Sequence, residues 1–263
     1  MIRTDLTNEE YHAMPDISSS AVKAAAKSLA HWKGAEYTET PALTMGTAFH
    51  ELVLEPDEKR VVCGPENRRG NIWKEMEAEA KEQGNILLTQ SDYNVVNAMA
   101  ESCLRNPRIN RIVKDPNTLI ENSIFVTCPE TGLKLKCRPD AYLESSQVCL
   151  DLKSTVDAGP KRGEFEKQFW SLKYHIQAAF YAYVLKLANL PVTYFAFAAT
   201  EKKPPYATGL HVLSGEVMEY SHEKMMNVLR RIAKAEEEGV YPTDWPELNM
   251  IHLPEWMKHE DKE

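Results

Sequence analysis

The sequence predicts an α/β protein in which a central mixed sheet of about five strands is flanked by helices. Residues 119–152 hold apolar runs of strand length separated by short polar turns. Residues 192–213 hold two more such runs on either side of the turn Lys202–Pro205. Helical segments with apolar stripes lie before, between and after these runs, at 44–54, 164–188 and 221–238.

We expect one domain, because 263 residues with 43% hydrophobic and 27% charged residues form an ordinary globular composition. Its N-terminal helical part would span about 1–115, its catalytic core about 116–240 and its Pro- and Trp-rich tail 241–263. No apolar run of about 18 residues occurs, and the first residues lack the pattern of a leader. We therefore expect a cytoplasmic protein without a membrane partner.

Cysteine usage indicates the same compartment. The five cysteines are odd in number and include no Cys-x-x-Cys pair. This pattern argues for reduced thiols and against a zinc or iron–sulfur site.

The N-terminal part should begin with two helices. Ser18–Ser20 would cap a helix that runs to about Trp32. Thr44–Leu54 should form a buried helix that contains Gly46, which costs about 1 kcal/mol relative to Ala. A close approach by another backbone or by substrate would account for this glycine. Residues 57–70 are polar and should form an irregular loop.

Two more helices should precede the sheet. Asn71–Gln83 should be a charged helix that stops at Gly84. After the short extended piece Ile86–Leu88, Ser91 should cap a helix that Asn106-Pro107 ends.

Two long helices should follow the first strands. The residues from Glu164 to Ala188 are apolar nearly all round, which predicts one long helix buried against the sheet. Ser221 should cap the last helix, which would run to Glu238 and stop at Gly239.

A hairpin near the middle of the chain should bring acidic side chains together. Leu133–Leu143 and Val148–Leu152 are strand-like runs around a polar turn, so Asp140 should come close to Asp151. Lys153 shares a strand face with Asp151. Two adjacent carboxylates repel unless one keeps a proton or a cation lies between them. Mg²⁺ fits this need and would support phosphodiester hydrolysis. The alternative from these residues alone is a surface hairpin with solvated charges.

Three motifs resemble those of a nuclease superfamily, in the same order. Pro139-Asp140, ten further residues and then Asp151-Leu152-Lys153 resemble the PD-(D/E)xK signature. Gly46–His50 resembles the Gly-x-x-x-His motif of the RecB-type and RecE-type branch, and Gln177–Tyr181 resembles its Gln-x-x-x-Tyr motif. The resemblance implies a restriction-endonuclease-like core and an Mg²⁺-dependent deoxyribonuclease.

Two end segments extend the resemblance over nearly the whole chain. Ile17–Ser20 and Gly239–Pro242 resemble the nuclease domains of the RecE (exodeoxyribonuclease VIII) family and its phage relatives. This implies 5′ to 3′ digestion of one strand of linear duplex DNA, leaving 3′ overhangs. It also implies a ring tetramer and cooperation with a RecT-like annealing protein in phage recombination. An endonuclease, a single-strand-specific nuclease and a non-catalytic DNA-binding module on the same fold remain as alternatives.

The resemblance also implies roles for the central residues. Asp140, Asp151 and the backbone carbonyl of Leu152 would hold Mg²⁺, for which Mn²⁺ could substitute. Lys153 would activate the attacking water. His50 would lie at the metal site as a ligand or just behind the ligands. The alternative for His50 is a core histidine bonded to a neighbour.

Three more residues are candidates for the site. Glu121 would be a third carboxylate near a second metal or its water, or else a surface glutamate on an edge strand. Gln177 lies in an apolar helix and needs a hydrogen-bond partner. The resemblance implies that this partner is a catalytic carboxylate or a metal-bound water. Tyr181, one turn later, would contact the DNA backbone, and its alternative is a core aromatic.

The net charge of −8 leaves the partner open, since proteins that bind DNA usually present a basic face. Metal ions would supply positive charge at the scissile phosphate, and local basic clusters would supply the rest. The candidate DNA-binding clusters are Arg68 with Arg69, Lys161 with Arg162, and Lys134 with Lys136 and Arg138. Arg68 and Arg69 fit a phosphate clamp and a solvated loop equally well.

Overall fold

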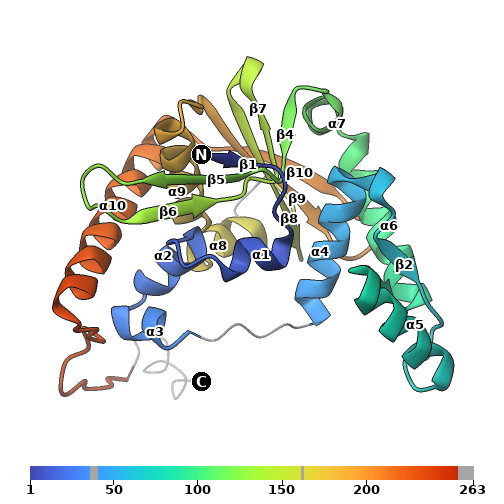
Figure 1. Ribbon diagram of the computed structural model, residues 1–263, viewed down its shortest axis with the longest axis horizontal. Coiled ribbons are helices and arrows are strands. Elements are labelled where there is room, and N and C mark those ends of the chain that lie inside the picture. Colours follow the sequence, from blue (N-terminus) through green and yellow to red (C-terminus); the bar gives the residue numbers. More distant parts are fainter. Residues whose placement is uncertain (36–40, 161–162, 254–263) are drawn as a thin grey trace, which may run out of the picture.

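A computed structural model describes residues 1–35, 41–160 and 163–253 (Figure 1). Five strands form the central sheet in the order β10-β9-β8-β7-β4. Their bounds are β4 Thr118–Ile120, β7 Ala141–Leu143, β8 Val148–Thr155, β9 Tyr194–Glu201 and β10 Thr208–Val212. β8 and β9 pair in parallel, and the other neighbours pair antiparallel. The predicted α/β class with a mixed five-stranded sheet is confirmed.

Helices cover both faces of this sheet, and each face has its own apolar core. One core includes residues of α2 (Ser19–Ala25), α8 (Glu164–Ser171), α9 (Tyr174–Leu187) and α10 (Gly215–Glu238). The other includes residues of α4 (Pro41–Leu54), α6 (Gln90–Arg105) and α7 (Pro107–Lys114). Along β8, Cys149 belongs to the first core while Leu150 and Leu152 belong to the second. Since strand side chains alternate, Asp151 and Lys153 point toward the α9 side.

Smaller elements complete the fold. β1 (Ile2–Arg3), β5 (Ser123–Thr127) and β6 (Lys134–Cys137) form a three-stranded sheet in the order β1-β5-β6. β2 (Val61–Cys63) pairs in parallel with β3 (Ile86–Leu88), so part of the segment expected as an irregular loop is a strand. The remaining helices are α1 (Asn8–Ala13), α3 (Leu29–Lys33), α5 (Asn71–Gln83) and the 3₁₀ turns Pro56–Glu58 and Glu144–Ser146.

Two segments expected as single strands are each broken in two. Residues 119–128 divide into β4 and β5, and residues 133–143 divide into β6 and β7. Each of these chain segments therefore takes part in both sheets. The breaks lie opposite each other: the Glu121 N–H donates to the Asp140 carbonyl at 3.2 Å. Glu121 has φ of +45°, outside the strand region. Pro139 has no N–H and cannot continue a ladder, which accounts for the second break.

Two segments expected as single helices are also divided. α8 and α9 are separated at Lys173, whose φ of +55° is left-handed. α2 and α3 are separated because Ser28 caps α3, its Oγ accepting from the His31 N–H at 3.1 Å.

Two helices begin earlier than expected, α10 by seven residues and α6 by two. Ser214 caps α10, whereas the predicted cap Ser221 is buried within the helix and donates to the Val217 carbonyl at 2.6 Å. Thr89, not Ser91, caps α6. Asn106-Pro107 ends α6 as predicted but also starts α7, because proline suits the first helical turn.

The predicted glycine stops are confirmed. Gly84 ends α5 with φ of +69°, and Gly239 ends α10 with φ of +69°. Glycine reaches this left-handed conformation without steric cost, so it ends a helix efficiently.

Candidate active site

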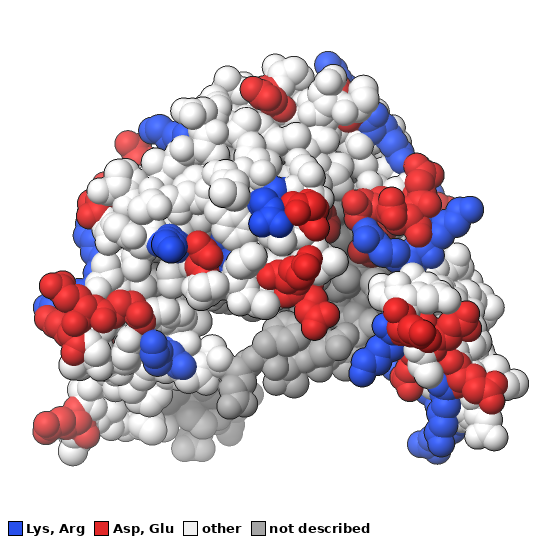
Figure 2. Space-filling model, in the orientation of Figure 1, with Lys and Arg blue, Asp and Glu red and all other residues white. Residues whose placement is uncertain are grey.

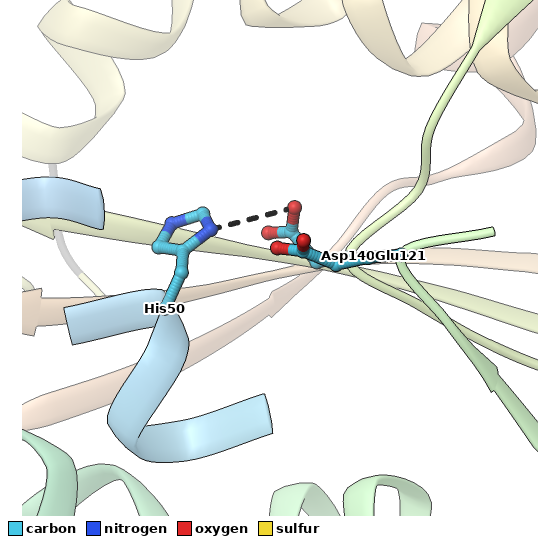
Figure 3. Close-up of side chains that lie close together, drawn as sticks. All are labelled: His50, Glu121 and Asp140. Atoms are coloured by element: carbon cyan, nitrogen blue, oxygen red, sulfur yellow. Dashed lines mark ion pairs between the residues drawn. The ribbon is translucent and has the colours of Figure 1, made fainter. Parts of the chain in front are cut away.

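Three side chains from separate segments converge in what we call the acidic cluster: His50, Glu121 and Asp140 (Figure 3). Their ligand atoms all lie within 4.8 Å of one another. His50 Nδ1 is 3.5 Å from Asp140 Oδ1. The sequence had left Glu121 between an active-site role and a surface position, and the structure brings it to the other two.

The paired strand breaks build this cluster. Glu121 and Asp140 occupy the two opposed breaks, so neither residue follows a regular ladder. Left-handed backbone at a residue other than glycine costs free energy and persists only where the surroundings hold it. The helix α4 supplies His50, whose Nε2 lies 3.1 Å from the Leu152 carbonyl. That carbonyl, expected to help hold the metal, therefore faces the imidazole.

Burial and mutual charge shift the titration of the acidic cluster. Burial would lower the pKa of His50, but the Asp140 carboxylate outweighs it and raises the pKa to about 9. Burial, followed by the charge of Asp140, raises the pKa of Glu121 to about 7. Burial opposes ionisation of Asp140, yet the His50 imidazole holds its pKa below the ordinary value. Asp140 therefore favours the protonated form of His50, and the surroundings favour the protonated form of Glu121.

A second group, the lysine cluster, consists of Asp151, Lys153 and Gln177. Asp151 is 1% exposed, and its Oδ2 accepts from Gln177 Nε2 at 2.6 Å. Its Oδ1 is paired with Lys153 Nζ. The predicted placement of Asp151 and Lys153 on one strand face is confirmed by this ion pair. Burial raises the pKa of Asp151 to about 6, although Lys153 acts in the opposite direction.

One hydrogen bond links the two clusters. The Leu152 N–H donates to Asp140 Oδ2 at 2.6 Å. Leu152 is the residue between Asp151 and Lys153, so the carboxylate of one cluster is fixed to the strand that carries the other. The expected approach of Asp140 to the second strand of the hairpin is therefore observed.

The acidic cluster and Lys153 of the lysine cluster line one cleft of about 500 Å³. Its charged and aromatic lining residues are Tyr11, His12, His50, Glu51, Glu55, Arg60, Glu121, Arg138, Asp140, Lys153, Tyr174 and Tyr181. Tyr174 was not among the candidates from sequence, yet Lys153 Nζ lies 4.8 Å from its ring centroid. The spacing Tyr174, Gln177, Tyr181 forms one helical stripe, and that periodicity could have identified it.

An N-terminal segment forms one wall of the cleft. Lys136 is 4% exposed, and its ammonium donates to the carbonyls of Tyr11 and Met14, each at 2.6 Å. Arg138 donates to the carbonyl of Leu6 at 3.0 Å. Lys136, which the sequence offered as a phosphate contact, is therefore engaged with backbone, because its amine needs acceptors once buried.

Other predicted DNA contacts lie elsewhere. Arg68 pairs with Asp92 at 2.7 Å and stands 5.4 Å from the Trp73 ring centroid. Arg68 and Arg69 are exposed and do not line the cleft, as far as the described residues show. Lys161 and Arg162 lie outside the described residues. Figure 2 shows acidic and basic side chains interspersed on the face in view, without one large basic patch.

The donor set of the acidic cluster suits a divalent cation. Two carboxylates and an imidazole lie within reach of a single ion. Carboxylate oxygens suit Mg²⁺, and the imidazole adds affinity for Mn²⁺. Metal ligands bind in their deprotonated form, so a bound dication would displace the proton that burial and the charge of Asp140 favour on Glu121.

The amino-acid sequence matches one protein family over residues 12–253, described as a PDDEXK-like domain of unknown function (DUF3799). The chain belongs to this family. The match spans the two broken strands, the hairpin and α9, and it agrees with the PD-(D/E)xK order of the motifs. No curated protein matches the chain.

A solved structure shares the fold of this PDDEXK-like domain. A candidate exonuclease from Eubacterium rectale superposes with a TM-score of 0.63 at 14% identity, covering 98% of this chain and 99% of that chain. A phage-related exonuclease from Haemophilus somnus gives a TM-score of 0.36 at 12% identity, with 86% and 96% covered. Within the described residues, no helix has the length and apolar character needed to span a membrane.

Proposed function

We propose that this protein is a metal-dependent deoxyribonuclease that hydrolyses phosphodiester bonds. The observation that carries the proposal is the junction of the acidic cluster with the lysine cluster in one cleft, through the hydrogen bond from Leu152 to Asp140. A cation site beside an ammonium group is what hydrolysis of a charged phosphodiester requires.

Each residue then has a chemical role. His50, Glu121 and Asp140 would hold Mg²⁺ or Mn²⁺, which when bound polarises the phosphate and acidifies a water. Lys153, kept charged by Asp151, orients that water and stabilises the extra negative charge of the transition state. Gln177 keeps Asp151 in place through its 2.6 Å hydrogen bond. Tyr181 lines the cleft and would contact the DNA backbone.

We further propose an exonuclease that digests one strand of linear duplex DNA from the 5′ end and leaves 3′ overhangs. The three motifs in their order support this choice, as does the shared fold with a structure described as a candidate exonuclease. We extend the proposal to a ring tetramer and to a RecT-like single-strand annealing protein as partner, both on the RecE-type resemblance of the sequence.

The proposal is tested by digesting linear duplex, linear single-stranded and circular duplex DNA with Mg²⁺, using 5′-labelled and 3′-labelled ends. Asp151→Ala is assayed alongside, with Glu130→Gln as a control because Glu130 is exposed and paired with Arg230. We expect mononucleotides from the 5′ labels of linear duplex alone, and no release by Asp151→Ala.

Other outcomes would distinguish the alternatives. Cutting of circles would replace the exonuclease with an endonuclease on the same fold. Digestion confined to single strands would contradict the duplex substrate, and DNA binding without metal-dependent cutting would leave a binding module. A monomer in light scattering would overturn the tetramer.

A further inference from the structure

Lys23 of α2 lies beside the lysine cluster, although no motif in the sequence includes it. Its Nζ is 3.5 Å from Gln177 Oε1 and 5.8 Å from the Tyr174 ring centroid. Within the described part of the chain, no carboxylate lies within ion-pair distance of this amine. Burial, and then the charge of Lys153, lowers the pKa of Lys23 to about 8. A largely buried ammonium without a carboxylate partner costs stability, so a compensating role is expected for it.

Lys23 and Asp151 contact opposite ends of the Gln177 amide and favour the same orientation of it. The amide oxygen faces Lys23, and the amide nitrogen donates to Asp151 Oδ2 at 2.6 Å. A flipped amide would place its oxygen against the Asp151 carboxylate and its NH₂ against an ammonium, which has donors only. Both contacts would be repulsive. The ammonium therefore favours the orientation that keeps Asp151 bonded.

We propose that Lys23 is a positioning residue, which fixes the Gln177 amide so that its nitrogen donates to Asp151. Among the described residues, the cleft lining includes Tyr174 and Lys153 but not Lys23. Lys23 therefore acts through Gln177 and not on the substrate. The catalytic consequence of this inference rests on the proposed nuclease function. The orientation of the amide follows from the hydrogen bonds alone.

The consequence for the site follows from the four-residue chain Lys23, Gln177, Asp151 and Lys153. When Gln177 donates to one oxygen of Asp151, Lys153 needs to pair with the other oxygen only. Without that donor, the buried Oδ2 would lack a partner and would draw the Lys153 ammonium away from the cleft. Loss of Lys23 should therefore lower the catalytic rate and leave DNA binding in place.

The first test needs no enzymatic activity. In metal-free protein, the side-chain NH₂ signals of Gln177 are identified by their loss in Gln177→Ala. Lys23→Met should shift or broaden these signals, and the control Lys27→Met, at an exposed lysine four residues later, should not. Unchanged Gln177 signals in Lys23→Met would overturn the inference, whether or not the protein cuts DNA. Lys23→Gln serves as a second uncharged variant if Lys23→Met does not fold, and the same outcomes apply.

The second test is a double-mutant cycle on DNA cleavage. We expect Lys23→Met to lower kcat by about tenfold with KM unchanged, the size typical of groups that orient a catalytic residue. Gln177→Ala combined with Lys23→Met should be no slower than Gln177→Ala alone, because both changes break the same chain. Lys23→Arg should recover most of the rate. Additive effects would overturn the inference in favour of direct action on DNA, and an inactive wild type would instead contradict the proposed function.

Discussion

The two clusters of the site differ in the number of partners that each carboxylate has. In the acidic cluster, Glu121 and Asp140 share one imidazole, and the pKa of Glu121 rises to about 7. In the lysine cluster, Asp151 alone has two donors, from Gln177 and Lys153. The acidic cluster has two carboxylates for one imidazole and therefore gains most from an added cation. In the lysine cluster one carboxylate is paired with one ammonium, so its contribution depends on how these groups are oriented. Substitutions in the acidic cluster should impair metal binding, whereas substitutions in the lysine cluster should impair cleavage alone.

The largest effect is expected from Asp140→Asn, because Asp140 belongs to the cation site and also accepts the bond from Leu152. Asparagine keeps an acceptor for Leu152 but removes the charge. Metal chemistry contributes several kcal/mol, so cleavage of linear duplex should fall by about 1000-fold. Initial rates with Mg²⁺ measure this, with Glu130→Gln as the control. A rate within about tenfold of wild type would show that Asp140 does not have the proposed role in metal binding.

Lys153→Met should break the other cluster. We expect a loss of about 100-fold in cleavage, as for removal of a group that orients or moves a proton. The melting temperature should still rise on adding Mg²⁺, because the acidic cluster is untouched. Lys27→Met, at an exposed lysine outside the site, is the control. If Lys153→Met also abolishes the metal-dependent rise, the division into two clusters is wrong.

Glu121→Gln should weaken metal binding by about tenfold, since it removes one of the two carboxylates among the three ligands. At a fixed metal concentration above Kd, this equals about 1.4 kcal/mol less stabilisation by the ion. Calorimetric titration with Mn²⁺ measures the affinity directly. An unchanged Kd would show that Glu121 is a neighbour of the site and not a ligand.

The last prediction concerns the pH dependence of metal-free protein. The pKa of His50 is raised to about 9, above its ordinary 6.5, so its stabilising contribution is complete below pH 6.5 and is lost as pH rises toward 9. The slope is at most one proton, or about 1.4 kcal/mol per pH unit. Urea unfolding with chelator at pH 6.5, 7.25 and 8 should show a steeper fall for wild type than for His50→Gln. Equal slopes would mean that Asp140 does not hold the proton on His50.

Much of the site could be predicted because it depends on local rules. Asp151 and Lys153 share a face because a strand alternates, and Asp140 approaches them because a short hairpin returns the chain. That Gln177 needs a hydrogen-bond partner follows from its apolar helix, and the family resemblance directed it to a catalytic carboxylate. These arguments need only nearby residues. The same holds for the five-stranded sheet and for the glycine stops of α5 and α10.

The remainder depends on long-range packing. Composition favours strands on both sides of Glu121, so the left-handed turn there is imposed by the second sheet and not by the local sequence. Lys23 looks like any helix lysine until α2 packs against α9. The end of one helix at Lys173 likewise comes without a glycine or proline. Roles that arise from such contacts leave no periodic signal in the chain.

The buried ammonium of Lys136 also joins distant parts of the chain. It bonds β6 to carbonyls of residues 11 and 14, more than 120 positions earlier, and so completes a wall of the cleft. Closing so long a loop costs conformational entropy, which the contacts of the folded wall must offset. The enclosure of the cleft therefore depends on a contact between segments that only the folded protein brings together.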